Sequence, residues 1–216
     1  MSDDPRRAGT LTSGEAPALW TFFRQWLKNP RAMAALAPSS RQLARQMVAQ
    51  IPPGSRRVIE LGAGTGVFTR VLIQSGLSPR ELLVLELNAE LSQFLRLQFP
   101  QLQVVNGDAG DLTEIVRGAR FADAGDVDAV VSGLGFLAMP RALQKRILDG
   151  VFSVLGAERP LIQFTYGPAS PVARSLLAEL GLSMRRASVA WKNVPPATVY
   201  VYTRNRSTAV RAVRVR

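Results

Sequence analysis

The stretch "VIELGAGTG", residues 58–66, joins a carboxylate to a glycine-rich turn. Gly62, Gly64 and Gly66, with Ala63 between the first two, let the chain turn sharply and approach a ligand closely. A helix that begins after the turn would offer free N–H groups. The spacing is G-x-G-x-G, whereas a dinucleotide site has G-x-G-x-x-G. Glu60 stands two residues before the first glycine, where it would repel a pyrophosphate and attract a cation, so the turn predicts a cationic ligand.

Two more acids follow apolar runs. Glu86 in "VLELN" comes about twenty residues after the glycines, where a carboxylate can accept from both ribose hydroxyls. Asp108 in "VVNGDAGDL" can accept from the amine of adenine, with the backbone of Ala109 completing the contact. Leu87, next to Glu86, is expected in the same site. Together the three acids favour S-adenosylmethionine over a set of solvated turn residues, with its methionine amino group at Glu60, directly or through water.

Ser132 in "VVSGLGFLAMP" and Tyr166 in "LIQFTYGPASPV" are the candidates for the reacting end of the site. The rRNA adenine dimethylases, which the chain generally resembles, carry Asn or Asp, then Pro and an aromatic residue at the first of these points. This chain lacks that motif, which favours an aliphatic amine as substrate. With a pKa of ~10.4, such an amine loses its proton at pH 7 for about 4 to 5 kcal/mol. Tyr166 would orient the amine or take its proton, although a packed tyrosine, with water or a lipid phosphate as acceptor, is the alternative.

The elements that must position these residues alternate along the chain. Short apolar runs predict buried strands, with helices between them, in "RRVIELG", "ELLVLEL", "LQVVNGD", "VDAVVSGL" and "PLIQFTYG". Two more runs, "LSMRRASVAWKN" and "TVYVYTR", leave no room for a crossover helix and should pair antiparallel. The expected fold is α/β, a Rossmann-like class I methyltransferase with a seven-stranded, mostly parallel sheet and a C-terminal antiparallel hairpin. Before it, a helix is expected from about Ser39 to Gln50, capped by Ser39 or Ser40.

The N-terminal segment concentrates aromatic and basic residues. Large apolar side chains recur at helical spacing at Leu19, Phe22, Phe23, Trp26 and Leu27, with Trp20, Arg24, Lys28 and Arg31 beside them. An interfacial membrane helix uses aromatic residues at headgroup depth and basic residues next to an anionic leaflet. A core helix is the alternative. A nucleic-acid surface would bind the charge but would leave the apolar face without a partner.

Composition narrows the function further. The chain of 216 residues has no cysteine and no histidine, which excludes thiolate chemistry and a Ser-His-Asp triad and argues against a transition-metal site. The net charge is +11, and the excess of basic residues lies in 16–59 and 180–216, which contain no acid. Such segregation predicts a polyanionic partner, with ordinary solubility as the alternative. No signal peptide or membrane-spanning run is present, so a cytoplasmic location is expected.

Several blocks resemble the bacterial phospholipid N-methyltransferases, which convert phosphatidylethanolamine to phosphatidylcholine. They are "FFRQWLKNPRAMAALAPSSRQLAR", "VIELGAGTGVFTR", "VVSGLGFLAMP", "QFTYGPASPV" and "KNVPPATVYVYTR". The resemblance implies stepwise methylation of phosphatidylethanolamine and its methylated derivatives, with S-adenosylhomocysteine as the second product. It also implies a monomer docked on the inner face of the cytoplasmic membrane. Related enzymes methylate other amino lipids, such as ornithine lipid, and an RNA adenine methyltransferase is the further alternative, although nucleic acid is not the expected partner.

The same resemblance divides the chain into three parts. Residues 1–37 form an N-terminal extension with the membrane helix at Leu19 to Lys28. Residues 38–204 form the methyltransferase domain, in which Pro38, Ser39 and Ser40 begin a segment that folds over the cofactor. Residues 205–216 form a basic tail.

Overall fold

The computed structural model describes residues 37–123, 125–191 and 196–205. The N-terminal residues predicted to bind a membrane, Leu19 to Arg31, lie outside this range, and so do nearly all of the basic tail. None of the described helices has the length and apolarity needed to cross a membrane. The proposed limits of the three parts of the chain therefore stay predictions.

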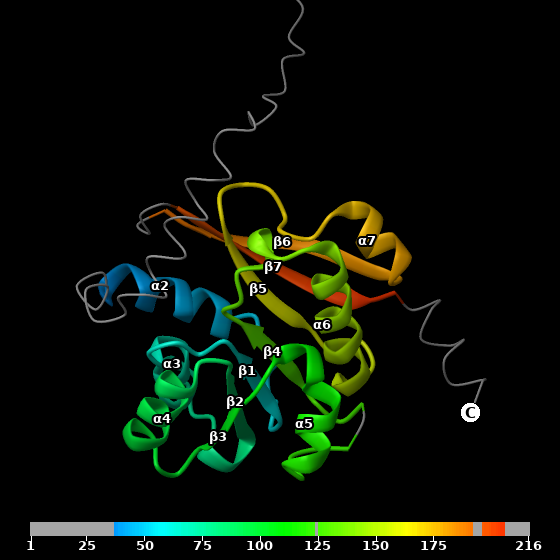
Figure 1. Ribbon diagram of the computed structural model, residues 1–216. Coiled ribbons are helices and arrows are strands. Elements are labelled where there is room, and N and C mark those ends of the chain that lie inside the picture. Colours follow the sequence, from blue (N-terminus) through cyan, green and yellow to red (C-terminus); the bar gives the residue numbers. More distant parts are fainter. Residues whose placement is uncertain (1–36, 124, 192–195, 206–216) are drawn as a thin grey trace, which may run out of the picture.

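Seven strands form a single sheet (Figure 1). They are β1 (Val58–Leu61), β2 (Leu82–Glu86), β3 (Gln103–Asn106), β4 (Ala129–Ser132), β5 (Leu161–Tyr166), β6 (Leu182–Ala190) and β7 (Ala197–Arg204). The order is β3-β2-β1-β4-β5-β7-β6, in which the first five strands run parallel and β7 runs antiparallel to β5 and β6. The predicted sheet and its terminal hairpin are confirmed.

In residues 37–205, apart from the undescribed gaps, six helices and three short 3-10 turns flank and connect the strands. They are α2 (Ala37–Val48), α3 (Val67–Gln74), η2 (Pro79–Glu81), α4 (Ala89–Gln98), η3 (Ala109–Asp111), α5 (Leu112–Gly118), η4 (Phe136–Ala138), α6 (Arg141–Val154) and α7 (Arg174–Glu179). Helix α2 begins at Ala37, so Ser39 and Ser40 lie inside it and neither is the cap that the sequence suggested. Pro38 is compatible with this start because a first-turn N–H has no helical partner in any case.

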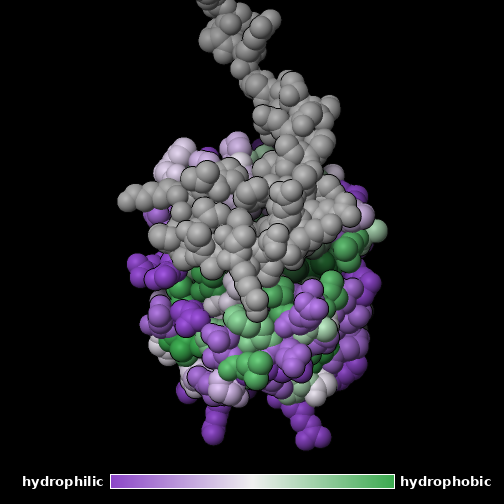
Figure 2. Space-filling view, turned by 60° about the vertical axis from the view of Figure 1, so that its left-hand side comes forward, coloured by the Kyte–Doolittle hydropathy of each residue, from purple (hydrophilic) through white to green (hydrophobic). Residues whose placement is uncertain are grey.

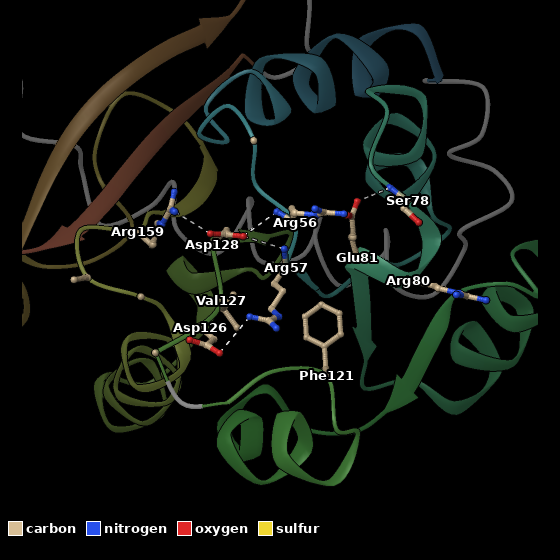
Figure 3. A pocket seen from close by; sticks show the side chains of 14 residues that line it. Arg56, Arg57, Ser78, Arg80, Glu81, Phe121, Asp126, Val127, Asp128 and Arg159 are labelled. Carbon is tan, nitrogen blue, oxygen red and sulfur yellow. Dashed lines mark hydrogen bonds and ion pairs between the residues drawn. The ribbon is translucent and has the colours of Figure 1, made fainter.

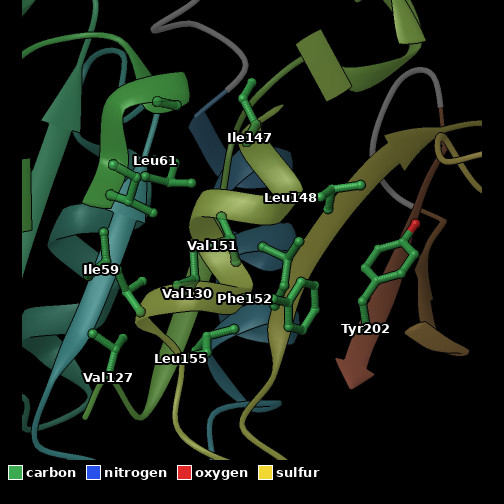
Figure 4. Close-up of a cluster of buried hydrophobic side chains, with 14 of the residues drawn as sticks. Ile59, Leu61, Val127, Val130, Ile147, Leu148, Val151, Phe152, Leu155 and Tyr202 are labelled. Carbon is green, nitrogen blue, oxygen red and sulfur yellow. The ribbon is translucent and has the colours of Figure 1, made fainter. Parts of the chain in front are cut away.

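The core consists of two apolar layers, one on each face of the sheet. Helices α5, α6 and α7 cover one face, where Ile147, Leu148 and Val151 of α6 pack against β1, β4 and β5 (Figures 1 and 4). Helices α2, α3 and α4 cover the other face through Met47, Leu72 and similar side chains. Strands β1, β2 and β4 are buried on both faces, as their continuous apolar runs predicted. The prediction was wrong for β3, which lies at the edge of the sheet and is only partly buried. Figure 2 shows apolar surface among hydrophilic side chains on the side that carries α2, α3 and α4.

Candidate active site

The direction in which successive strands are added to the sheet reverses between β1 and β4, although both strands run parallel. From β1 the chain proceeds outward to β2 and β3, and it then returns to place β4 and β5 on the other side of β1. In an open parallel sheet, a ligand binds outside the carboxyl ends of the strands at such a reversal. Apart from Ser39 and Ser40, which belong to α2, the predicted residues of the site come from strand ends or turns at this edge, so the topology brings them to one place.

The glycine turn lies at the end of β1 and leads into α3. Gly62, Gly64 and Gly66 have φ angles of 69°, 57° and 80°, which a residue with a side chain rarely adopts. A Cβ atom on Gly62 would lie 2.8 Å from Leu134 in the loop after β4. The predicted sharp turn is present, and its main chain packs tightly against the neighbouring strand end.

Glu86 connects the end of β2 to that turn. The carboxylate is buried, Oε2 accepts from the backbone N–H of Gly64 at 2.9 Å, and Oε1 accepts from Asn88 N–H at 2.9 Å. Each carboxylate oxygen has a second lone pair, so both can accept another hydrogen bond. Leu87, the next residue, is 68% exposed and leaves apolar surface beside this carboxylate.

Glu60 lies under α3 and is 1% exposed. Thr69 donates to Oε2 at 2.7 Å, while Oε1 has no hydrogen-bond partner among the described residues. Burial raises the pKa of Glu60 to about 7, although the bond from Thr69 opposes this shift. A buried carboxyl group with an unused oxygen fits a ligand that brings positive charge, because a nearby cation stabilises the ionised form.

Asp108 follows β3 and caps η3, where its Oδ1 accepts from Gly110 N–H at 2.7 Å. Ala109 beside it is buried. Arg146 of α6 lies 3.7 Å from Asp108 and 2.6 Å from Asp111, and it also donates to the carbonyl of Gly110. No sequence pattern indicated this arginine, because α6 is far along the chain from β3. Arg146 fixes the turn in which Asp108 and Ala109 lie.

Ser132 and Tyr166 are both at the carboxyl edge, but on opposite faces of the sheet. Ser132 is fully buried, and its Oγ accepts from Leu134 N–H at 3.3 Å. It pairs in register with Leu61, which faces α6. Tyr166 is half-buried on the face of α2, with its ring edge-on to Phe164 at 5.6 Å between ring centroids. Their predicted contact with the substrate amine stays a prediction.

Two buried glutamines, which the sequence analysis did not single out, fix the loop after β4. Gln163 of β5 donates to the carbonyl of Leu134 at 2.9 Å, and Gln144 of α6 donates to the carbonyl of Phe136 at 2.8 Å. An uncharged polar residue inside an apolar strand, as in "LIQFTY", is the one sequence signal that could have drawn attention to Gln163. Ser39 and Ser40 belong to α2, and their side chains lie outside the described part of the protein.

A groove of about 920 Å³ lies at the opposite edge of the sheet, where the strands begin (Figure 3). Most of its charged residues form ion pairs: Arg56 with Glu81 at 2.9 Å, Arg57 with Asp126 at 3.2 Å, and Arg159 with Asp128 at 3.0 Å. Asp128 also accepts from the backbone N–H groups of Arg56 and Arg57. None of the residues predicted to bind cofactor or substrate lines this groove.

The fold recurs in solved structures. The 1,6-didemethyltoxoflavin-N1-methyltransferase of Burkholderia thailandensis matches with a TM-score of 0.60 and 12% identity, over 93% of this chain and 94% of that one. A SAM dependent methyltransferase of Archaeoglobus fulgidus matches with a TM-score of 0.58 and 14% identity, over 84% and 99%. Phosphoethanolamine N-methyltransferase 1 of Haemonchus contortus matches with a TM-score of 0.59 and 14% identity, over 91% and 51%. At these identities the likeness establishes the fold alone.

Sequence comparison gives the family. No protein-family model matches the chain. The ornithine lipid N-methyltransferase of Singulisphaera acidiphila is 36% identical over 151 residues, which are 68% of this chain and 77% of that protein. The chain belongs to the family of S-adenosylmethionine-dependent methyltransferases. The predicted class of enzyme and its cofactor are thereby confirmed, whereas the relative is named for ornithine lipid and not for phosphatidylethanolamine.

Proposed function

We propose that the protein transfers methyl groups from S-adenosylmethionine to the primary amine in the headgroup of an amino lipid. The relationship to an ornithine lipid N-methyltransferase carries this proposal and favours ornithine lipid over phosphatidylethanolamine. The missing Asn/Asp-Pro-aromatic motif after β4 supports an aliphatic amine as substrate rather than a nucleobase.

In this proposal the carboxyl edge of β1 to β3 binds the cofactor. Glu60 balances the charge of the methionine end, and the main chain from Gly62 to Gly66 encloses it. Glu86 binds the ribose through its free lone pairs, and Leu87, Asp108 and Ala109 contact the adenine. Ser39 and Ser40, in the first turns of α2, belong to the segment that closes over the cofactor.

The reaction requires a neutral amine held in line with the methyl group. When bound, S-adenosylmethionine supplies an electrophilic methyl: the amine lone pair forms the N–C bond, the C–S bond breaks with its electron pair staying on sulfur, and S-adenosylhomocysteine is left. The loop after β4, fixed by Gln163 and Gln144, limits where the amine can lie. Because the amine and the methyl group are already held in position, the chemical step no longer requires the loss of translational and rotational entropy that two free reactants would undergo.

The experiment uses the full chain, labelled S-adenosylmethionine and three kinds of vesicle: phosphatidylglycerol alone, or with either ornithine lipid or phosphatidylethanolamine added. We expect label in the amino lipids, with ornithine lipid preferred, and none in phosphatidylglycerol. Absence of label from both amino lipids, or label entering rRNA supplied in parallel, would contradict the proposal.

Membrane docking through residues 19–28 is a separate part of the proposal and concerns residues outside the described range. Aromatic and basic residues at helical spacing support it, and they would hold the enzyme on the inner face of the cytoplasmic membrane as a monomer. We expect Trp26→Glu to reduce sedimentation with anionic vesicles while the affinity for S-adenosylhomocysteine is unchanged. Undiminished sedimentation would instead assign this helix to the core.

A further inference from the structure

Two polar atoms of β5 lack a hydrogen-bond partner although their side chains are buried. Gln163 is 1% exposed and Thr165 is 5% exposed. Gln163 Oε1 and Thr165 Oγ1 make no hydrogen bond within the described part of the chain. A buried polar atom without a hydrogen-bond partner destabilises the folded state, so such atoms are uncommon and each needs an explanation. Two of them on one strand call for a ligand that brings donors.

The two acceptors face the same way and lie close to the reacting end of the site. Residues two apart in a strand share a face, with Cα atoms about 6.7 Å apart. Gln163 pairs in register with Ser132, and its Nε2 donates to the carbonyls of Leu134 and Phe164. Because both partners are carbonyl oxygens, the donating atom of the amide must be its nitrogen. The bond to the carbonyl of Phe164 also holds the Gln163 amide beside the main chain that leads to Thr165. Oε1 is therefore left as an acceptor.

The loop of residues 167–172 lies against this same face. Three hydroxyl groups of β7 hold it: Thr198 donates to the carbonyl of Gly167, Tyr200 donates to that of Pro168, and Tyr202 bonds to the hydroxyl of Ser170. In the sheet, Thr198 pairs with Thr165 and Tyr200 pairs with Gln163. The loop is thus fastened over the strand positions directly next to the two acceptors.

We propose that Gln163 Oε1 and Thr165 Oγ1 form the subsite that receives the two N–H groups of the substrate's primary amine, an inference that rests on the proposed function. A neutral primary amine has two N–H donors and one lone pair. Two acceptors satisfy both donors and leave the lone pair to attack the methyl group. The subsite thereby assigns the amine an orientation as well as a place.

The same count of donors predicts how the enzyme treats its own products. The attack leaves both N–H bonds on a methylated ammonium product, and one of these protons must pass to water before the nitrogen can react again. The neutral monomethylated amine then has one N–H and the neutral dimethylated amine has none, so each cycle of transfer and deprotonation removes one bond to the subsite. Affinity falls with each methyl group, and the partly methylated lipids are released between steps.

The test is Thr165→Val, which removes the hydroxyl but keeps the shape of the side chain. We expect the KM for the unmethylated lipid to rise about tenfold, since a bond to a polar N–H group is lost at a desolvated site. The KM for the dimethylated lipid and the affinity for S-adenosylhomocysteine should not change. The midpoint of thermal unfolding should stay the same or rise, because an unpaired buried hydroxyl has been removed. Thr165→Ser should restore the use of the unmethylated lipid.

Ser92→Ala is the matched control. Ser92 of α4 also carries a fully buried hydroxyl without a described partner, but it lies on the other side of the sheet. We expect the same effect on thermal unfolding and no effect on any lipid. Equal KM values for the unmethylated lipid in the wild type and Thr165→Val, or an equal rise for all lipids, would overturn the subsite. Failure of the wild type to methylate any amino lipid would instead contradict the proposed function.

Discussion

The polar side chains at the two edges of the sheet differ in whether they are paired: most are paired at the amino edge, and several are unpaired at the carboxyl edge. At the amino edge, a groove of about 920 Å³ is lined by arginines and acids that already pair with one another (Figure 3). At the carboxyl edge, Glu60 Oε1, Gln163 Oε1 and Thr165 Oγ1 are buried and unpaired among the described residues. The amino-edge groove thus has most of its charges neutralised by one another, whereas the carboxyl edge keeps polar atoms that can still bind a ligand. Three of the four buried side-chain atoms without a partner among the described residues lie at the edge where we propose the site, and the fourth, Ser92 Oγ, lies in α4.

The largest expected difference between the edges is in cofactor binding. Glu86→Ala removes the acceptors proposed for the ribose and leaves Gly64 N–H without its partner. We expect the dissociation constant of S-adenosylhomocysteine, measured by calorimetry, to rise about a hundredfold, which corresponds to two hydrogen bonds to a charged group. Asp126→Ala at the amino edge is the control and should bind as the wild type does. Unchanged binding in Glu86→Ala would remove this residue from the cofactor site.

Glycine substitutions compare how tightly the two edges are packed. Gly62 and Gly54 both have positive φ angles, but a Cβ atom would meet Leu134 at 2.8 Å at Gly62 and nothing within 4 Å at Gly54. Gly54→Ala should lower the free energy of unfolding by about 1 kcal/mol through backbone strain. Gly62→Ala should lower it by about 2 kcal/mol more, because overpacking adds to the strain. Equal losses in urea unfolding would mean that Leu134 moves away freely.

Cofactor affinity should depend on pH through Glu60. Its pKa is raised to about 7 in the folded chain, so the folded state retains a proton that the unfolded state loses. Its contribution to stability is therefore complete below the unfolded pKa and is lost as the pH rises through about 7. A cationic ligand favours the ionised form, so the affinity for S-adenosylhomocysteine, whose amino group is positively charged, should rise about tenfold from pH 6 to 8. Glu60→Gln should abolish this dependence, and a dependence that persists would have another origin.

The smallest effect is expected from the ion pairs of the groove. Arg57 and Asp126 are about half exposed, so their pair at 3.2 Å is screened by solvent. Asp126→Ala should change the free energy of unfolding by less than about 0.5 kcal/mol in urea unfolding. A loss several times larger would show that the groove is a structural support of the fold.

The sequence predicted the strands, the hairpin and the glycine turn because each depends on local pattern. Apolar runs give buried strands, and three glycines at alternate positions give a turn with positive φ angles. The sequence also predicted the acidic residues at the strand ends, but not the groups with which they form hydrogen bonds and ion pairs. The bond from Gly64 to Glu86 depends on strand order, and the position of Arg146 depends on how α6 packs.

Ser132 and Tyr166 show the same limit more clearly. Each comes at the end of a predicted strand, and both were expected to face the substrate. The register between β4 and β5, which pairs Ser132 with Gln163, places Tyr166 on the other face. Side chains alternate between the two faces of a sheet, so an error of one residue in the register reverses the face on which each side chain lies. Gln163 was overlooked for a related reason, since its significance lies in unpaired atoms that only the fold reveals.

The position of β7 between β5 and β6 has a consequence for the biosynthesis of the protein. During translation, β5 leaves the ribosome before β7, and its apolar edge has no antiparallel neighbour until residues 197–204 have been made. An open, apolar edge strand invites pairing with other chains. A ribosome that stalls after β6 would therefore release a nascent chain prone to aggregation, and the loop at residues 167–172 would lack its fastening to β7 as well.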